Sequence, residues 1–175
     1  MADAAVLTTE RLILRPPVAE DLPWVQGAMN TPAVMAHLGG VRPDDAVAES
    51  LADDIAAFHT GGHQRWTVWL RDGSETRVGR VGLFHLSSPA APEGLRGQRE
   101  IGWTFAEAHW GKGYATEAAE GALGFAFGVL GLACVYGQTS DSNAASTRMM
   151  QRLGFARRAE FDYVDPDYPP AAPHA

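Results

Sequence analysis

Apolar and polar positions at the start of the chain alternate with the period of a strand and then recur with the period of a helix. The alternation over residues 7–15 predicts a strand, which two prolines end. Helical spacing then predicts one helix over residues 19–28 and a second over residues 43–61, whose acidic first turn suits the helix dipole. The apolar face of the second helix consists of Val47, Leu51, Ile55 and Phe58.

The middle of the chain has the pattern of an antiparallel sheet. Residues 65–70 and 78–86 predict two strands, and the Asp72-Gly73 pair between them favours a hairpin turn. Residues 87–97 are rich in Pro, Ala and Gly, so we expect a mobile loop there, followed by a strand over residues 99–105.

A glycine turn then introduces a long helix of small residues. Its apolar face is formed by Ala115, Ala118, Ala119, Ala122, Ala126 and Val129. Gly121, Gly124 and Gly128 lie within the same helix, and each costs about 1 kcal/mol relative to alanine. We therefore expect this helix to pack tightly against a sheet.

The last part of the chain predicts further alternation of strand and helix. We expect an apolar strand over residues 132–138 that buries Cys134, a helix over residues 143–152 closed by Gly154, and a final strand pair from Phe155. The proline-rich residues 166–175 are predicted to be a disordered tail. This order of elements predicts a single α/β domain over residues 1–165, in which helices cover the faces of a mixed sheet.

Composition and charge narrow the class of function. The chain has 175 residues, enough for about one domain, and its net charge of −7 disfavours nucleic acid as a partner. Its longest apolar segment, residues 123–136, is shorter than the roughly 18–20 residues of a membrane-spanning helix. The single cysteine allows neither an intrachain disulfide nor a thiolate metal cluster, and the first residues lack the features of a signal peptide. We therefore expect a cytoplasmic protein with no metal and no membrane partner.

Residues 110–117 form a glycine turn between a predicted strand and a predicted helix. Free N–H groups at a helix start favour a phosphate, although Gly-x-Gly is equally typical of a tight turn chosen for its backbone geometry. Lys112, the only lysine of the chain, is followed by glycine instead of Ser or Thr, so this is not a Walker loop. Thr116 stands where a dinucleotide fingerprint has its third glycine.

Four blocks in order resemble the GNAT superfamily of acyl-CoA N-acyltransferases. They are TERLILR at 9–15, EIGW at 100–103, WGKGYATEA at 110–118, and NAAS at 143–146 followed by LGF at 153–155. The chain is most similar to the branch of ribosomal-protein N-terminal (alanine) acetyltransferases, and it departs from the superfamily signature at Ala108, where Gln or Arg is usual. The resemblance implies a GNAT fold (α+β) with a mixed central sheet of about six to seven strands and about four flanking helices.

The resemblance also implies acetyl-CoA as co-substrate. Its pyrophosphate would bind the turn, and its pantetheine would run beside the strand, where one backbone N–H can polarise the thioester carbonyl. The residues implied are Trp110, Gly111, Lys112, Gly113, Tyr114 and Ala115 in the turn, Trp103, Thr104 and Phe105 in the strand, and Asn143, Ser146 and Arg148 in the following helix. Asn143 also suits a helix cap, and the side chains of Lys112 and Arg148 also suit solvent.

Acetyl transfer to an amine requires a base, because an alkyl ammonium is almost fully protonated at neutral pH. Glu100 is the first candidate, and its alternative interpretation is a surface glutamate paired with Arg99 or Arg96. Glu107, His85 and His109 are weaker candidates for the base.

The leaving thiolate requires a proton or a hydrogen bond. Many GNAT enzymes supply it from a tyrosine seven residues beyond the asparagine, where this chain has Met150. Methionine cannot donate a proton, so Ser146 is the candidate replacement, besides a capping contact with Asn143.

The sequence thus predicts an N-acetyltransferase in which an amine attacks acetyl-CoA directly within a ternary complex. The acceptor is a protein N-terminal α-amine by resemblance to the branch, or a small-molecule amine of an amino-acid or antibiotic-like kind. Residues 1–60 hold nine acidic and three basic side chains, which would attract a cationic amine. A non-catalytic acyl-CoA-binding module and a purely structural or partner-binding domain remain as alternatives. The family resemblance makes a homodimer possible.

Overall fold

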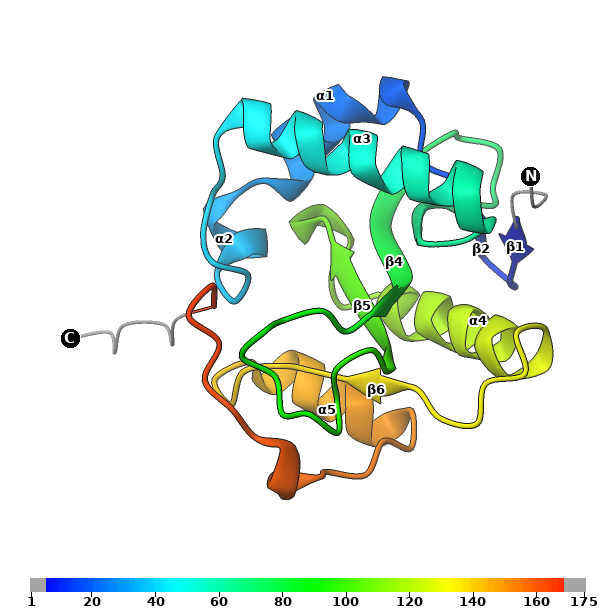
Figure 1. Ribbon diagram of the computed structural model, residues 1–175. Helices are drawn as coiled ribbons and strands as arrows, with labels where there is room; N and C mark the ends of the chain where they lie inside the picture. The colour runs from blue at the N-terminus through cyan, green and yellow to red at the C-terminus, as the bar shows by residue number, and fades with distance from the viewer. Residues whose placement is uncertain (1–5, 169–175) are drawn as a thin grey trace.

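The structure is a computed structural model that describes residues 6–168. A six-stranded sheet with the strand order β1-β2-β3-β4-β5-β6 forms its centre (Figure 1). Neighbouring strands are antiparallel from β1 to β5, whereas β6 is parallel to β5. The strands span Leu7–Thr8 (β1), Leu12–Arg15 (β2), Arg65–Leu70 (β3), Arg77–His85 (β4), Arg99–Phe105 (β5) and Tyr136–Gly137 (β6).

Within residues 6–168, five α-helices accompany the sheet, with short 3₁₀ and π turns between them. The α-helices span Leu22–Trp24 (α1), Pro32–Met35 (α2), Asp44–Gly61 (α3), Tyr114–Gly128 (α4) and Ala144–Arg152 (α5). The other turns are Ala19–Asp21 (η1), Val25–Met29 (η2, a π-helix), Glu107–His109 (η3) and Ala159–Phe161 (η4). In Figure 1, α1 to α3 gather beyond one side of β4 and β5, and α4 and α5 lie toward the other.

The hydrophobic core lies between the sheet and α4. Side chains alternate between the faces of a strand, so the paired residues Trp66 and Val81, and Leu83 and Ile101, share one face. This face packs against the α4 alanines, which are fully buried: Ala118, Ala119, Ala122 and Ala126. The predicted packing of a small-residue helix on a sheet is confirmed.

The glycines of α4 behave differently from one another. A Cβ on Gly121 would lie 3.0 Å from a Thr9 methyl group, whereas one on Gly124 or Gly128 would meet nothing within 4 Å. The expected close approach therefore holds for Gly121 alone, because the other two glycines are on the exposed side of the helix.

The opposite face of the sheet carries a buried polar layer beneath α1 and α3. Asp21 is fully buried, and its carboxylate accepts hydrogen bonds from Thr67 Oγ1 and Arg77 Nε, both at 2.7 Å. Asp54 on α3 accepts a hydrogen bond from buried Arg80 Nη2 at 2.7 Å. Two carboxylates of the acidic N-terminal part are thus used inside the fold.

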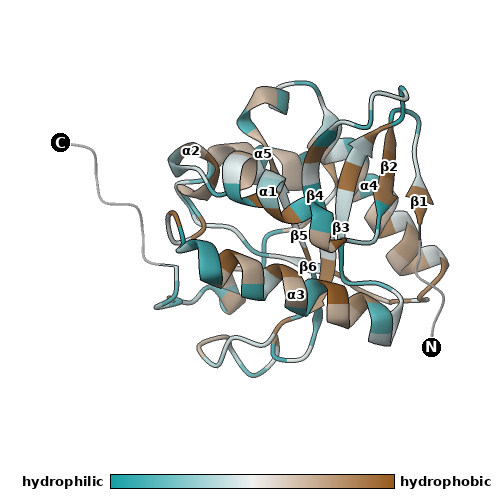
Figure 2. Cartoon of the chain, turned by 90° about the horizontal axis from the view of Figure 1, so that it is seen from above, coloured by the Kyte–Doolittle hydropathy of each residue, from teal (hydrophilic) through white to brown (hydrophobic). Residues whose placement is uncertain are grey.

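Other acidic residues of that part lie on the outside of α3. Asp44, Asp45, Glu49 and Asp53 are exposed, and in Figure 2 hydrophilic and hydrophobic colours alternate along this helix. These carboxylates face solvent, as charged residues on helices commonly do.

Two N-terminal elements differ from their prediction. The strand expected over residues 7–15 is divided by a turn at Thr9, whose N–H donates to the Leu12 carbonyl at 2.9 Å, so that β1 folds back on β2. The helix expected over residues 19–28 is broken into η1, α1 and η2. Its last turn is wide, with the Asn30 N–H bonded to the Val25 carbonyl five residues earlier.

The end of the chain differs more. Only Tyr136–Gly137 of the predicted strand 132–138 pairs with the sheet, and Cys134 is exposed instead of buried, because the chain reaches β5 only after it. No strand pair follows Phe155 within residues 6–168, where η4 and extended backbone are found instead. Pro166–Asp167 form a turn, and residues 169–175 of the predicted tail lie outside the described part.

The remaining predicted elements are confirmed within a residue or two. The strands over 65–70 and 78–86 pair as a hairpin through Asp72-Gly73, the strand over 99–105 is β5, and Gly154 ends α5 with a φ of 84°. Residues 87–98 contain no helix or strand. Leu86, Ala91 and Leu95 are buried against Phe161 and Tyr163. No helix among the described residues is long and apolar enough to cross a bilayer.

Candidate active site

The glycine turn connects β5 to α4 through η3. Gly111 and Gly113 have φ values of 72° and 79°, a left-handed conformation that favours glycine. Trp110, which is half-exposed, closes the turn by donating its indole N–H to the Phe105 carbonyl at 2.8 Å. The turn is therefore fastened to the end of β5 by a side chain that belongs to the predicted motif.

The first turn of α4 presents unbonded N–H groups next to these glycines. The first main-chain bond of the helix runs from the Glu117 N–H to the Gly113 carbonyl at 3.1 Å. The N–H groups of Tyr114, Ala115 and Thr116 precede that bond, so the helix itself gives them no acceptor. Together with the positive end of the helix dipole, they can hold an anion.

One edge of β5 is open just before the turn. β6 pairs only with Glu100 and Ile101, whereas β4 pairs with β5 as far as Phe105. The Ala106 N–H donates to Val78 on the β4 side, and backbone groups alternate in direction along a strand. The N–H groups of Trp103 and Phe105 therefore point to the open edge, where they can bond an extended ligand.

Glu100 stands where the two parallel strands separate. Its Oε2 accepts a hydrogen bond from Gln138 Nε2 at 2.5 Å, and Gln138 Oε1 accepts one from the Tyr163 hydroxyl at 2.5 Å. Burial and the negative charge of Asp165 raise the pKa of Tyr163, which keeps its hydroxyl protonated as a donor.

The predicted alternative, a pairing of Glu100 with Arg99 or Arg96, is not seen among residues 6–168. Arg99 Nη2 contacts His63 Nε2 at 2.9 Å, and Arg96 Nε donates to the Ala91 carbonyl. The partner of the Glu100 carboxylate is instead an amide.

The start of α5 follows β6 along the chain. Asn143 is the N-cap residue, as predicted, and its Oδ1 accepts a hydrogen bond from the Ser146 N–H at 3.2 Å. The Ser146 hydroxyl makes no hydrogen bond within the described part of the chain. Met150 packs against β6, with its methyl carbon 3.1 Å from the position of a Cβ on Gly137.

The other candidate side chains lie nearer the surface. Lys112 Nζ donates to the Ala108 carbonyl at 3.2 Å, and Arg148 is exposed on α5. Exposed His85 contacts the Gly97 carbonyl through Nδ1, Glu107 is exposed, and half-buried His109 has a pKa lowered by burial and by Lys112. None of these contacts reaches Glu100.

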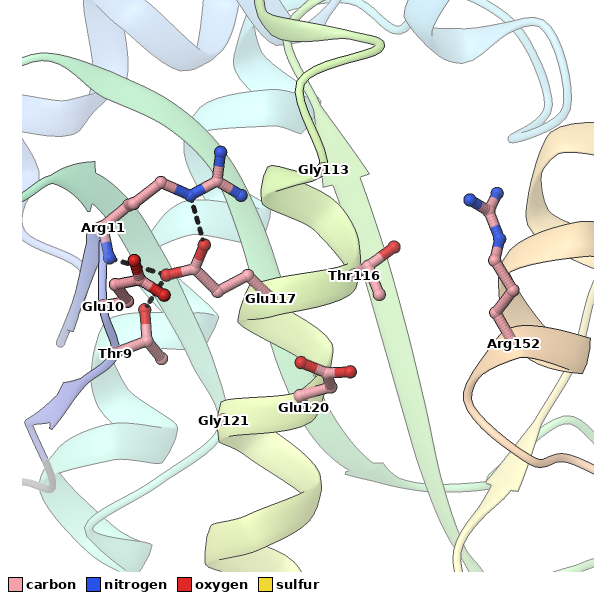
Figure 3. Close-up of a pocket in the computed structure, with 9 residues that line it drawn as sticks. All are labelled: Thr9, Glu10, Arg11, Gly113, Thr116, Glu117, Glu120, Gly121 and Arg152. Atoms are coloured by element: carbon pink, nitrogen blue, oxygen red, sulfur yellow. Dashed lines mark hydrogen bonds and ion pairs between the residues drawn. The ribbon is translucent and has the colours of Figure 1, made fainter.

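A group of residues that sequence reasoning missed holds the turn from the other side. Glu117 Oε1 accepts hydrogen bonds from Thr9 Oγ1 at 2.6 Å and the Arg11 N–H at 2.7 Å, and its Oε2 accepts one from Arg11 Nε at 2.7 Å (Figure 3). Arg11 Nη1 donates to the Lys112 carbonyl at 2.9 Å. Both sequence blocks that contain these residues were evident, but nothing in a sequence pairs positions so far apart.

Comparison with known proteins agrees with this geometry. Residues 11–156 match the model of the acetyltransferase (GNAT) domain. This chain belongs to the GNAT acetyltransferase domain family. The match includes β2 to β6, the glycine turn and all of α5.

Individual relatives carry names of the same activity. The chain is 26% identical over 154 residues to an uncharacterized N-acetyltransferase, YoaA, of Bacillus subtilis (strain 168), covering 87% of this chain and 83% of the relative. It is 38% identical over 164 residues to the FsC-acetyl coenzyme A-N(2)-transacetylase of Aspergillus fumigatus, covering 89% of this chain and 66% of the relative. This chain is therefore an acetyltransferase. The two alternatives, a non-catalytic acyl-CoA-binding module and a purely structural or partner-binding domain, are excluded.

Solved structures show the same fold. An acetyltransferase from Agrobacterium tumefaciens str. C58 superposes with a TM-score of 0.74 at 30% identity, covering 88% of this chain and 85% of that one. Spermidine N-acetyltransferase from Vibrio cholerae, in complex with CoA and spermine, gives a TM-score of 0.67 at 21% identity, covering 86% and 83%. GNAT acetyltransferases use acetyl-CoA, and the second structure contains CoA.

Proposed function

We propose that this GNAT chain transfers the acetyl group of acetyl-CoA to a primary amine by direct attack within one ternary complex. The observation that carries the proposal is the continuity of two features: the open edge of β5 at Trp103 to Phe105 leads directly into the glycine turn and the start of α4. An extended ligand with a phosphate at one end fits this arrangement.

The fit to acetyl-CoA rests on backbone groups. N–H groups from Gly111 to Ala115 would hold the pyrophosphate, and no Cβ on Gly111 obstructs the approach of a phosphate to the turn. The Trp110 N–H does not join them, because it donates to the Glu107 carbonyl at 3.1 Å. Trp103, Thr104 and Phe105 would hold the pantetheine, and one N–H of this open edge would stabilise the oxyanion that develops on the thioester carbonyl. Lys112, Asn143, Ser146 and Arg148 complete the proposed cofactor contacts at the edges of the site.

The chemistry requires two proton transfers. Glu100 would accept a proton from the acceptor ammonium, either directly or through water, after which the neutral nitrogen forms a bond to the acetyl carbon. The bond between that carbon and sulfur breaks, and the thiolate would receive a proton through the Ser146 hydroxyl. Ser146 fits this role because its hydroxyl is not used elsewhere in the described chain, whereas Met150 cannot donate a proton.

For the acceptor we propose a protein N-terminal α-amine, on the resemblance of the four sequence blocks to the ribosomal-protein acetyltransferase branch. A small-molecule amine is the second candidate. It is favoured by the name of the Aspergillus fumigatus relative, which specifies transfer from acetyl coenzyme A to an N(2) position. The two acceptors differ in size and are distinguished by direct assay.

The test combines binding and turnover. Calorimetric titration with acetyl-CoA, desulfo-CoA and ATP should show micromolar binding of the two CoA compounds. Release of free thiol with panels of short peptides and small amines should then identify the acceptor. Absence of CoA binding would overturn the proposal, and binding without thiol release across both panels would overturn amine transfer.

Matched variants test the proposed base. The variant Glu100→Gln should lower kcat about 10²- to 10⁴-fold, as expected for loss of a general base. Its affinity for CoA should equal that of the wild type. Glu93→Gln, which changes an exposed glutamate in the loop before β5, serves as the control. Equal turnover in both variants would remove Glu100 from the mechanism.

A further inference from the structure

Arg11 contacts the backbone of the glycine turn, not only a side chain. Its guanidinium bonds Glu117 through Nε and the Lys112 carbonyl through Nη1, at 2.7 and 2.9 Å. Its Nη2 lies 3.3 Å from the position that a Cβ on Gly113 would occupy. Two nitrogens of the guanidinium, Nη1 and Nη2, therefore lie close to the peptide that joins Lys112 to Gly113.

Holding one end of a peptide group fixes the direction of the other. A trans peptide is planar, and its C=O and N–H point in opposite directions. With the Lys112 carbonyl directed at Arg11, the Gly113 N–H is directed away from Arg11. It then points to the side of the turn on which the pyrophosphate is proposed to bind.

The glycine makes this orientation easy to lose. Rotating the peptide by about 180° exchanges the positive φ of the following residue for a negative one, as in the interconversion of two turn types. Glycine populates both regions about equally, so Gly113, with a φ of 79°, imposes no preference of its own. An external contact must therefore select the orientation.

Glu117 and Thr9 keep Arg11 in place for this contact. Glu117 accepts both the backbone N–H and the side-chain Nε–H of Arg11, and Thr9 Oγ1 orients the carboxylate by donating to Oε1. The guanidinium is neutralised by this ion pair and bonded to a carbonyl. Arg11 therefore acts on the turn by fixing the direction of a carbonyl through a hydrogen bond, and not by attracting a phosphate with an unpaired positive charge.

We propose that Arg11, oriented by Glu117 and Thr9, is a positioning residue that locks the Lys112–Gly113 peptide with its N–H aimed at the pyrophosphate of CoA. The inference rests on the proposed function. It gives the N-terminal hairpin of β1 and β2 a part in cofactor binding, although this hairpin lies at the opposite edge of the sheet from β6.

Variants at residues 11 and 117 distinguish the hydrogen-bonding geometry of the guanidinium from its positive charge. Arg11→Met removes the donors, Arg11→Lys keeps the charge but cannot bond Glu117 and the Lys112 carbonyl in the same fork, and Glu117→Gln removes the acceptor of Arg11 Nε. Arg15→Met is the control, because Arg15 lies at the end of β2, the strand that begins directly after Arg11, and its guanidinium stacks over Trp69. Thermal unfolding of each variant confirms folding before binding is measured.

We expect CoA to bind Arg11→Met and Arg11→Lys about tenfold more weakly, the loss of one charged hydrogen bond, and to bind Arg15→Met like the wild type. Turnover of S-acetylpantetheine, which lacks the pyrophosphate, should stay unchanged in the Arg11 variants. In the ligand-free protein, the NMR signal of the Gly113 amide should shift in both Arg11 variants and in Glu117→Gln.

Each contrary result has a distinct meaning. If Arg11→Met or Arg11→Lys binds CoA with the affinity of the wild type, Arg11 does not position the Lys112–Gly113 peptide. Equal loss of activity with S-acetylpantetheine and acetyl-CoA also overturns this role, because the effect would then be general. If the wild type itself binds no CoA, the proposed function fails, while an unshifted Gly113 signal in the ligand-free Arg11 variants independently refutes the lock.

Discussion

The ion pair between Asp54 and Arg80 offers the sharpest test of how the sheet is held to α3. Asp54 and Arg80 are 7% and 6% exposed, and their side chains are 2.7 Å apart, with Arg65 Nη1 at 3.7 Å from the same carboxylate oxygen. The variant Asp54→Asn keeps the shape of the side chain and removes its charge. Arg80 then stays buried as a cation without its partner.

The expected loss of stability follows from the burial of both groups. Removing one member of a buried pair costs about 3–5 kcal/mol. For a domain of this size each kcal/mol lowers the unfolding temperature by about 2–4 °C, so the variant should melt about 6–20 °C lower. Burial lowers the pKa of Arg80 to about 10, an effect that Arg65 adds to and Asp54 only partly offsets. Replacing both residues, as in Asp54→Leu with Arg80→Met, should therefore cost less than Asp54→Asn alone.

Thermal and urea unfolding at neutral pH measure these differences. Asp53→Asn is the control, because Asp53 is the exposed neighbour on the same helix and its loss should change stability by no more than about 0.5 kcal/mol. If Asp54→Asn and Asp53→Asn unfold at the same temperature, the ion pair between Asp54 and Arg80 contributes nothing to stability. If the double variant is less stable than the single one, the burial of an unpaired Arg80 cation is not the main cost of Asp54→Asn.

Three further variants test local features. Asn143→Ala should destabilise the fold by about 1 kcal/mol through loss of the α5 cap, measured by urea unfolding, and Asn143→Asp should restore it. Burial raises the pKa of Glu117, but hydrogen bonds from Thr9 and Arg11 outweigh it and hold the pKa below 4.5. The melting difference between wild type and Glu117→Gln should thus be full above pH 4.5 and shrink as pH falls below it; a constant difference refutes this. Burial and Arg99 lower the pKa of His63, so stability should fall as pH drops below 6.5, and His63→Gln should flatten that slope between pH 7 and 5.

The elements that the sequence predicted best are those whose pattern is local. The hairpin of β3 and β4, strand β5 and helices α3 to α5 each have their own periodicity and their own turn or cap residues, such as Gly73 and Gly154. These signals lie within about twenty residues and need no knowledge of distant partners.

The wrong predictions concern segments whose structure depends on a partner. Residues 132–138 are apolar enough for a strand, yet only two of them pair, because β6 meets β5 at Glu100 and Ile101 and then separates from it. The exposure of Cys134 follows from the same late arrival at the sheet. The hydropathy of a segment indicates whether it can be buried. Whether it forms hydrogen bonds within a sheet depends on the neighbouring strand.

The candidate site divides in the same way. The glycine turn, strand β5 and the Asn143 cap are contiguous motifs, and the structure has the predicted strand before the turn, a helix after it and Asn143 as the cap of α5. The contacts of Arg11 with Glu117 and of Glu100 with Gln138 join residues 106 and 38 positions apart. A single sequence shows both members of each pair but not that they meet.

Both long-range contacts lie within the family match, but a residue that supports the contact of Glu100 with Gln138 lies outside it. Arg11 is the first residue that the GNAT domain model covers, whereas Tyr163, which orients Gln138 beside Glu100, lies beyond its end at residue 156. The pair of Arg11 and Glu117 thus falls within the matched domain, whereas the contact of Glu100 with Gln138 is supported by a tyrosine that lies after it. Variants at Arg11 should accordingly change CoA affinity, whereas Tyr163→Phe should change the kinetics of the acceptor and leave CoA affinity unaltered.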